Sequence, residues 1–142
     1  FLSIHANASL NSRASGFEVW YLPEDYRRPD LVSPTLVGTQ DPEVLSILNT
    51  IREEEFSVES ILLAQRILGG LDGEIGSLSP NRGLKEETWY VVRNARMPSV
   101  LVELGFVTNP EEGIRLREDT YLNQLALGIY NGVTSFIEDY EK

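Results

Sequence analysis

Apolar residues are concentrated in short runs that have the pattern of β-strands. Residues 98–106 are Pro-Ser-Val-Leu-Val-Glu-Leu-Gly-Phe, a run of β-branched residues and leucines bounded by a proline and a glycine. Residues 1–6, Phe-Leu-Ser-Ile-His-Ala, alternate with a period of two. Two further strands are predicted at residues 16–22 and 89–92, where aromatic and β-branched residues gather.

Three longer segments have the three- and four-residue spacing of amphipathic helices. The first begins at Asp41-Pro42, with Asp41 as the cap, and is predicted to end at the acidic run 53–55. The second is predicted to run from Ser57 to Gly69-Gly70. The third has one apolar stripe, formed by Leu122, Leu125, Ala126, Ile129, Val133, Phe136, Ile137 and Tyr140.

The connecting residues indicate turns and one more helix start. Residues 71–83 are rich in Gly, Ser, Asp, Pro and Asn and are predicted to form a loop. Asn109, Pro110 and Glu112 form an Asn-x-x-Glu capping box in which Asn109 is the cap. Strands that alternate with helices indicate the α/β class, and continuous apolar strands favour a mostly parallel sheet covered on both faces.

The length, the net charge and the absence of cysteine limit which kinds of partner and metal site the chain can have. The chain has 142 residues, which fits one domain, and a formal net charge of -10, which argues against nucleic acid and anionic membrane surfaces. No apolar run reaches the roughly 18 to 20 residues that a membrane span needs. There is no cysteine, so a metal site would use His, Asp or Glu, and His5 is the only histidine.

Glu103 is a carboxylate inside the apolar run 98–106. A buried carboxylate costs roughly several kcal/mol unless it is paired or near a metal. Glu103 is therefore either functional or a structural residue paired with Arg93 or Arg96. If the two strands are parallel neighbours, His5 and Glu103 open on one sheet edge, where ligands bind. The alternative for His5 is a hydrogen-bonded structural histidine.

The sequence resembles the zinc-dependent N-acetylmuramoyl-L-alanine amidases, which cut bacterial peptidoglycan. Two stretches carry this resemblance, Ser3 to Ala8 and residues 98–112. In this family one strand carries a histidine and a later strand carries a glutamate. The segments that connect these two strands are similar to residues 16–22, 81–85 and 92–98 of this chain. The resemblance implies a three-layer α/β domain with a mixed, mostly parallel sheet and helices on both faces. It also implies peptidoglycan as the partner and a periplasmic or extracellular location.

The family holds zinc with two histidines and one glutamate, and a further glutamate acts as general base towards a zinc-activated water. His5 matches the second histidine, and Glu103 matches the base. The first histidine and the zinc glutamate have no match. Residues 1–142 are therefore expected to be the C-terminal portion of an amidase catalytic domain that lacks its N-terminal strands. We expect the two further Zn²⁺ ligands upstream of Phe1.

Residues 23–56 are expected to be an insertion in the family fold. Some family members carry a helix here that blocks the zinc until an activator protein displaces it. In that case Glu53, Glu54 or Glu55 would approach the metal, whereas the other interpretation of this acidic run is a solvated face. Two alternative functions stay open. One is a non-catalytic peptidoglycan- or partner-binding module that retains the amidase fold, and the other is a zinc carboxypeptidase on a similar sheet.

Overall fold

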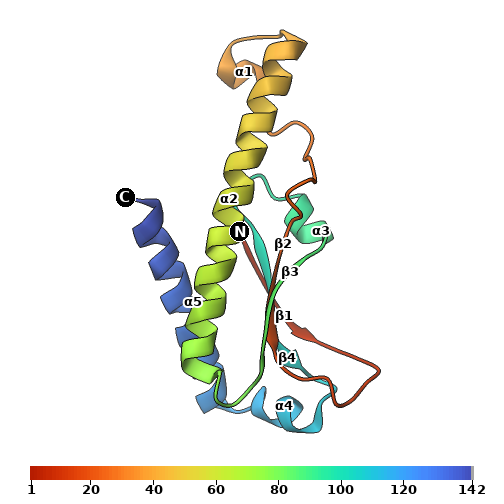
Figure 1. The fold of residues 1–142 in the computed structure, drawn as a ribbon, viewed down its shortest axis with the longest axis vertical. Helices are drawn as coiled ribbons and strands as arrows, with labels where there is room; N and C mark the ends of the chain where they lie inside the picture. The colour runs from red at the N-terminus through yellow and green to blue at the C-terminus, as the bar shows by residue number, and fades with distance from the viewer. Residues whose placement is uncertain (142) are drawn as a thin grey trace.

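A computed structural model describes residues 1–141 of the chain (Figure 1). One sheet has the strand order β1-β4-β2-β3. The pairs β1–β4 and β2–β3 are parallel, and the central pair β4–β2 is antiparallel, which confirms a mixed, mostly parallel sheet. The strands are β1 (Leu2–Asn7), β2 (Phe17–Tyr21), β3 (Asn81–Glu86) and β4 (Val100–Phe106).

Helices lie on both faces of this sheet. Helix α2 crosses one face, and α5 packs along α2 on the side away from the sheet (Figure 1). The short α3 covers part of the other face, where Val92 packs with Leu101 of β4 and Leu22. The helices are α1 (Pro34–Val37), α2 (Pro42–Ile75), α3 (Tyr90–Arg93), α4 (Pro110–Arg115) and α5 (Asp119–Tyr140).

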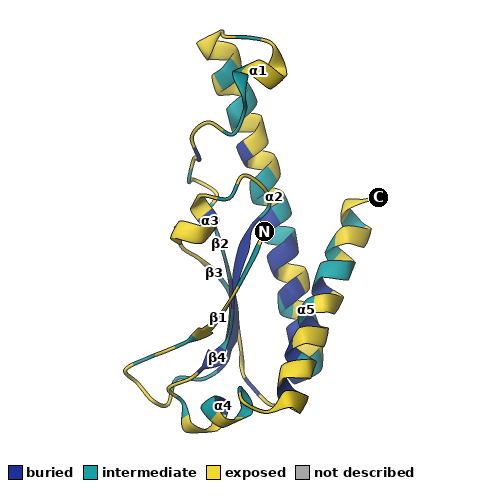
Figure 2. Cartoon of the chain, turned by 180° about the vertical axis from the view of Figure 1, so that it is seen from behind, coloured by how far each residue is buried: buried dark blue, intermediate teal, exposed yellow. Residues whose placement is uncertain are grey.

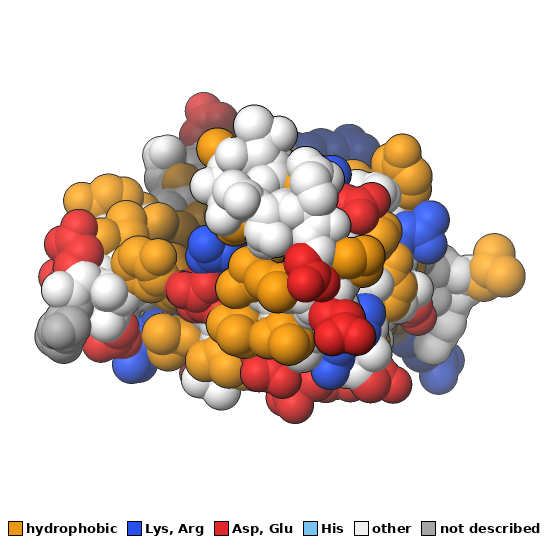
Figure 3. All heavy atoms as spheres, turned by 90° about the horizontal axis from the view of Figure 1, so that it is seen from above, with side chains coloured by type: hydrophobic (Ala, Val, Ile, Leu, Met, Phe, Trp, Pro, Cys, Tyr) orange, Lys and Arg blue, Asp and Glu red, His pale blue; other side chains and the backbone are white. Residues whose placement is uncertain are grey.

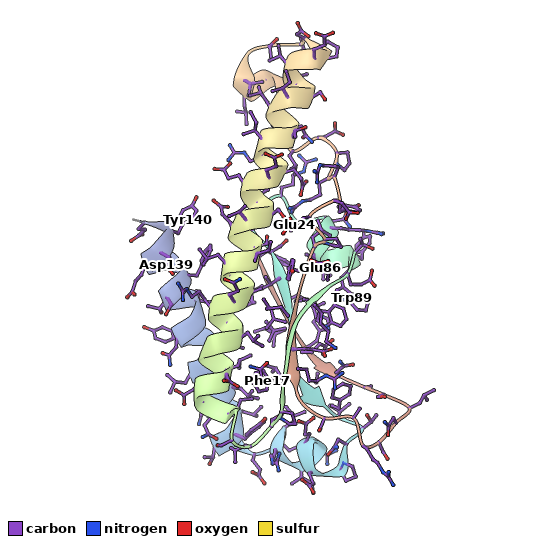
Figure 4. The ribbon with its side chains drawn as sticks, viewed as in Figure 1. Phe17, Glu24, Glu86, Trp89, Asp139 and Tyr140 are labelled. Atoms are coloured by element: carbon purple, nitrogen blue, oxygen red, sulfur yellow. The ribbon has the colours of Figure 1, made fainter. Side chains whose placement is uncertain are left out.

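The larger core lies between the sheet and the C-terminal half of α2 (Figure 2). Alternation along β4 directs Val100 and Val102 into this core and Leu101 to the opposite face. Phe17 of β2 points towards α2 (Figure 4) and is fully buried. Burying a side chain of this size contributes roughly 1.5–3 kcal/mol, so this interface is the main source of stability.

Helix α2 corrects the prediction of two separate helices. It runs without interruption from Pro42 to Ile75, and Asp41 caps it by accepting from the Glu43 amide at 2.9 Å, as predicted. Gly70 does not end it, because this glycine provides room for α5 instead. A Cβ atom on Gly70 would overlap the carbonyl oxygen of Gly128 and lie 2.9 Å from the Gly132 nitrogen.

The prediction of a strand at residues 89–92 is also wrong. These residues form α3, because Val92 and Arg93 donate back to the Trp89 carbonyl and Val92 is buried. The fourth strand is β3 instead, which begins within the predicted loop 71–83. Residues 71–75 of that predicted loop belong to α2. Packing overrides the high β-propensity of residues 89–92. The ring of Trp89 packs edge-on against that of Trp20, with 5.7 Å between the ring centroids.

The start of α4 has one of the two interactions of the predicted capping box. The side chain of Asn109 accepts from the amides of Glu111 and Glu112 at 3.0 and 3.1 Å, which confirms the cap. The carboxylate of Glu112 does not complete the box. It turns into the protein and accepts from the amides of Gly16 and Phe106 and from the Ser79 hydroxyl.

The N-terminal half of α2 extends beyond the sheet together with α1 (Figures 1 and 2). Figure 3 views this end, where the exposed apolar residues include Leu36, Ile47 and Ile51. No helix within residues 1–141 combines the length and the hydropathy that a membrane crossing requires.

Glu53 anchors this extension, which corrects the solvated-face interpretation at this residue, whereas Glu54 and Glu55 are exposed as that interpretation expects. The side chains of Glu53 and Arg28 are 2% and 3% exposed, and they pair at 2.9 Å. The Arg28 backbone amide also donates to Glu53, and the guanidinium donates to the Ala95 carbonyl. The loop after β2, helix α2 and the segment before β4 are therefore fastened at one point.

We expect Gly70→Ala to destabilise the fold by about 1–3 kcal/mol, because the methyl group must separate α2 from α5. Gly69 is the matched control, since nothing lies within 4 Å of a Cβ atom at that position. Gly69→Ala should stabilise the helix by about 0.5–1 kcal/mol. Urea unfolding measures both, and equal effects would contradict the close helix contact.

Glu53→Gln should destabilise the fold by about 3–5 kcal/mol, because it leaves the Arg28 guanidinium buried without a charge partner. Glu54→Gln, on the exposed side of the same turn, should change stability by less than about 0.5 kcal/mol. Thermal unfolding of the two variants at neutral pH tests this. A small loss for Glu53→Gln would show that the pair is accessible to water.

Candidate active site

His5 and Glu103 are neighbours across the parallel β1–β4 pair. Their Cα atoms are register partners, in a ladder that also pairs Ser3 with Leu101. Leu101 belongs to the cluster on the α3 side of the sheet, and Glu103 follows it by two residues. Side chains two residues apart in a strand share a face, so His5 and Glu103 lie side by side on the face opposite α2.

Glu103 has an unsatisfied oxygen. Its Oε2 atom is buried and has no hydrogen-bond partner among the described residues. The structural interpretation, a pair with Arg93 or Arg96, is therefore not what the structure contains. Burial raises the pKa of Glu103; nearby His5 opposes this rise and the negative charge of Glu18 adds to it.

His5 is an exposed residue of an edge strand and not a histidine enclosed in the core. Its Nε2 atom is 2.7 Å from the Ser3 hydroxyl oxygen, and the tautomer decides which of the two donates. An imidazole held by a hydrogen bond beside an unsatisfied carboxylate can bind a metal or a polar substrate group.

Glu18 is a site residue that the sequence analysis missed. It is the register partner of Glu103 on β2, and its side chain is 3% exposed. Its carboxylate is held by two cations from β3, with Arg82 Nε at 2.7 Å and Lys85 Nζ at 3.0 Å. The indole of Trp20 and the amide of Asn7 also donate to it, at 3.1 and 3.2 Å.

The pKa values of the two neighbouring carboxylates, Glu18 and Glu103, are therefore shifted in opposite directions. Burial acts to raise the pKa of Glu18, but the hydrogen bonds and charges of Arg82 and Lys85 outweigh it, and the pKa is lowered. A sequence signal existed, because Glu18 interrupts its apolar strand in the same way as Glu103. The Arg-Gly-Leu-Lys sequence of β3 then supplies its cations.

The described residues do not make a metal site on their own. Residues 1–141 contain no group of three His, Asp or Glu side chains placed to hold a metal ion. A zinc-dependent centre has three protein ligands, so the part of the chain described here offers one candidate ligand, His5, beside one candidate base.

A family model described as N-acetylmuramoyl-L-alanine amidase matches residues 1–135. The chain belongs to this family. The match contains the whole His5–Glu103 site and all four strands of the sheet. The resemblance inferred from the two end motifs is thereby confirmed.

Two relatives illustrate the extent of the match. The chain is 29% identical over 136 residues to the amidase LytC of Bacillus subtilis and covers 96% of itself and 21% of that protein. It is 28% identical over 154 residues to the amidase AmiA of Salmonella typhimurium, covering 99% of itself and 53% of the relative. The chain thus spans about half, or less, of the length of these relatives.

Solved structures show the same fold. The amidase AmiC2 of Nostoc punctiforme has a TM-score of 0.69 and 27% identity, and the alignment covers 97% of this chain and 57% of that chain. An amidase of Clostridium difficile 630 also has a TM-score of 0.69, with 28% identity and coverages of 96% and 56%. The amidase family of this chain therefore has the mixed α/β architecture described above.

We expect Glu103→Gln to raise the melting temperature by a few degrees at pH 7 in the presence of a chelator. The raised pKa of Glu103 means that folding disfavours its charged form, so this carboxylate reduces stability above its folded pKa. The advantage of the variant should disappear as the pH falls towards the unfolded pKa near about 4.3.

Glu138→Gln, an exposed carboxylate on α5, is the control and should leave the melting temperature unchanged at both pH values. Differential scanning fluorimetry at pH 7 and pH 4 provides the comparison. A lower melting temperature for Glu103→Gln at pH 7 would mean that the carboxylate has a stabilising partner.

Proposed function

We propose that this chain contributes to a peptidoglycan hydrolase that cleaves the amide between N-acetylmuramic acid and L-alanine. The supporting observation is the buried, unpartnered Oε2 atom of Glu103 beside His5. Three other buried glutamates in the described residues have their carboxylates bonded, and Glu103 is the exception. A carboxylate oxygen without a partner among residues 1–141 remains available to take a proton from water.

Glu103 is proposed as the general base. It accepts a proton from the attacking water, and it returns that proton to the leaving nitrogen of L-alanine when the C–N bond breaks. Its raised pKa makes the carboxylate a stronger proton acceptor, and a pKa closer to the working pH keeps both the basic and the acidic form accessible during the reaction. A positioned group of this kind contributes about 10² to 10⁴ in rate.

His5 is proposed as a ligand of a zinc ion, with the remaining ligands supplied outside the described residues. When bound, the metal would supply Lewis acidity at the scissile amide. The Ser3 hydroxyl is placed to fix the imidazole, since its oxygen lies 2.7 Å from Nε2. Two of the relatives are named cell wall amidases, which supports a site of action at the cell envelope.

The test measures products from purified peptidoglycan sacculi with the full-length protein. Amidase action should free the amino terminus of L-alanine and leave the glycan strands intact. Glu103→Gln should lower turnover by about 10² or more while zinc remains bound. His5→Ala should release zinc, as measured by metal analysis after dialysis, and chelation of the wild type should abolish turnover.

Glu54→Gln is the matched control, because it removes an exposed carboxylate outside the site. Zinc loss in Glu103→Gln would show that Glu103 is a zinc ligand and not the general base. Release of a C-terminal amino acid would indicate a carboxypeptidase instead. Binding of sacculi without any product would favour a non-catalytic binding module.

A further inference from the structure

Charged side chains form a row across all four strands. In the strand order of the sheet, His5 on β1 is followed by Glu103 on β4, Glu18 on β2, and the cations of β3. Neighbouring strands are about 4.8 Å apart, so β3 lies about 10 Å from β4. The proposed reaction uses the first two members of this row and leaves the cations of β3 without a function towards substrate.

The cations of β3 carry more charge than Glu18 neutralises. Arg82 and Lys85 share this one carboxylate, which leaves one net positive charge. Glu18 is 3% exposed, whereas Arg82 and Lys85 are 34% and 32% exposed. Water and any substrate on this face therefore meet the cations and not the carboxylate beneath them.

Arg82 and Lys85 still have hydrogen-bond donors to offer. The described contacts occupy Nε of Arg82, which donates to Glu18, and Nη1, which donates to the Ser15 carbonyl at 3.3 Å. The Nη2 group is left for a further acceptor, and the ammonium of Lys85 has three donors for one described partner.

Both cations are also held in place. The guanidinium of Arg82 lies 5.0 Å from the centroid of the Phe106 ring, and Lys85 Nζ lies 5.5 Å from that of the Trp20 ring. Contact with an aromatic face contributes about 0.5–1 kcal/mol at exposed sites. Because Glu18 fixes the other side of each cation, little side-chain entropy is lost when an anion binds.

We propose that Arg82 and Lys85 bind a carboxylate of the substrate peptide, with Glu18 as the residue that positions them. This inference rests on the proposed function. An extended peptide rises about 3.3–3.6 Å per residue, so about 10 Å corresponds to about three residues from the cleaved amide. The subsite is also needed electrostatically, because a chain with a net charge of -10 repels an anionic peptide elsewhere.

The experiment compares matched muramoyl-peptides that carry either a free carboxylate or a carboxamide at the second or third peptide residue. The wild-type protein should have a KM about tenfold lower for the acid than for the amide at one of these positions. The kcat values of the two substrates should agree. The preference should decrease as salt is raised, because the cations are partly exposed.

Variants assign the preference to residues. Arg82→Gln and Lys85→Gln should each raise the KM for the acid towards that for the amide, so that the acid-to-amide ratio measured within each variant approaches one. Arg117→Gln removes an exposed positive charge outside the row and should retain the full preference. Thermal unfolding verifies that each variant is folded, and the wild-type comparison does not depend on any variant.

The outcomes separate this inference from the proposed function. Cleavage of acid and amide with equal KM would overturn the carboxylate subsite and leave the amidase proposal intact. If neither substrate is cleaved, the amidase proposal fails, and calorimetric binding of the acid and the amide to Glu103→Gln then decides the subsite. Equal affinities there would overturn it, and tighter binding of the acid would support it.

Discussion

The site depends on one constraint, which is that a buried carboxylate must find hydrogen-bond donors. Glu112 accepts from two backbone amides and a hydroxyl, and Glu53 accepts from the guanidinium and the amide of Arg28. Glu18 accepts from four donors. Glu103 keeps one buried oxygen that has no partner among residues 1–141. The same physical rule gives three of these carboxylates hydrogen-bond partners, and one oxygen of the fourth is an exception to it.

The central antiparallel pair of strands makes this difference possible. Glu18 and Glu103 are directly opposite each other on β2 and β4, where two negative charges repel. The cations of β3 reach Glu18 and keep it ionised, and its charge then acts on Glu103. The order of the strands therefore places a fixed charge and a titratable one next to each other. That arrangement separates the pKa values of two chemically identical groups.

The sequence predicted the three strands that carry most of the site, because β1, β2 and β4 are apolar runs interrupted by single polar residues. It also placed His5 and Glu103 side by side, on the condition of parallel strands that the structure meets. It did not predict β3. The two cations of this strand, Arg82 and Lys85, are three residues apart and do not show the alternation of a strand, and both pair with Glu18 only once the fold has formed. Tertiary pairing, and not local propensity, forms that strand.

Long-range contacts also explain why α2 was divided wrongly. Gly69-Gly70 is a stop signal in local terms, but Gly70 faces Gly128 and Gly132 of α5 in a contact that no sequence window spans. The acidic run was similarly ambiguous. Its first residue is buried and its second is exposed, and the Arg28 partner that distinguishes them lies 25 residues upstream.

The Arg28–Glu53 pair bears on whether the acidic run could approach a metal, as expected for a blocking helix. Glu53 could move only by leaving Arg28 buried without its charge partner, a loss of about 3–5 kcal/mol that one new ligand bond would have to exceed. Glu55 is paired with Arg52 on the surface of the same helix. Glu53 is therefore part of the anchor that fastens α2 to the loop after β2, and a mobile blocking element would have to release this anchor first.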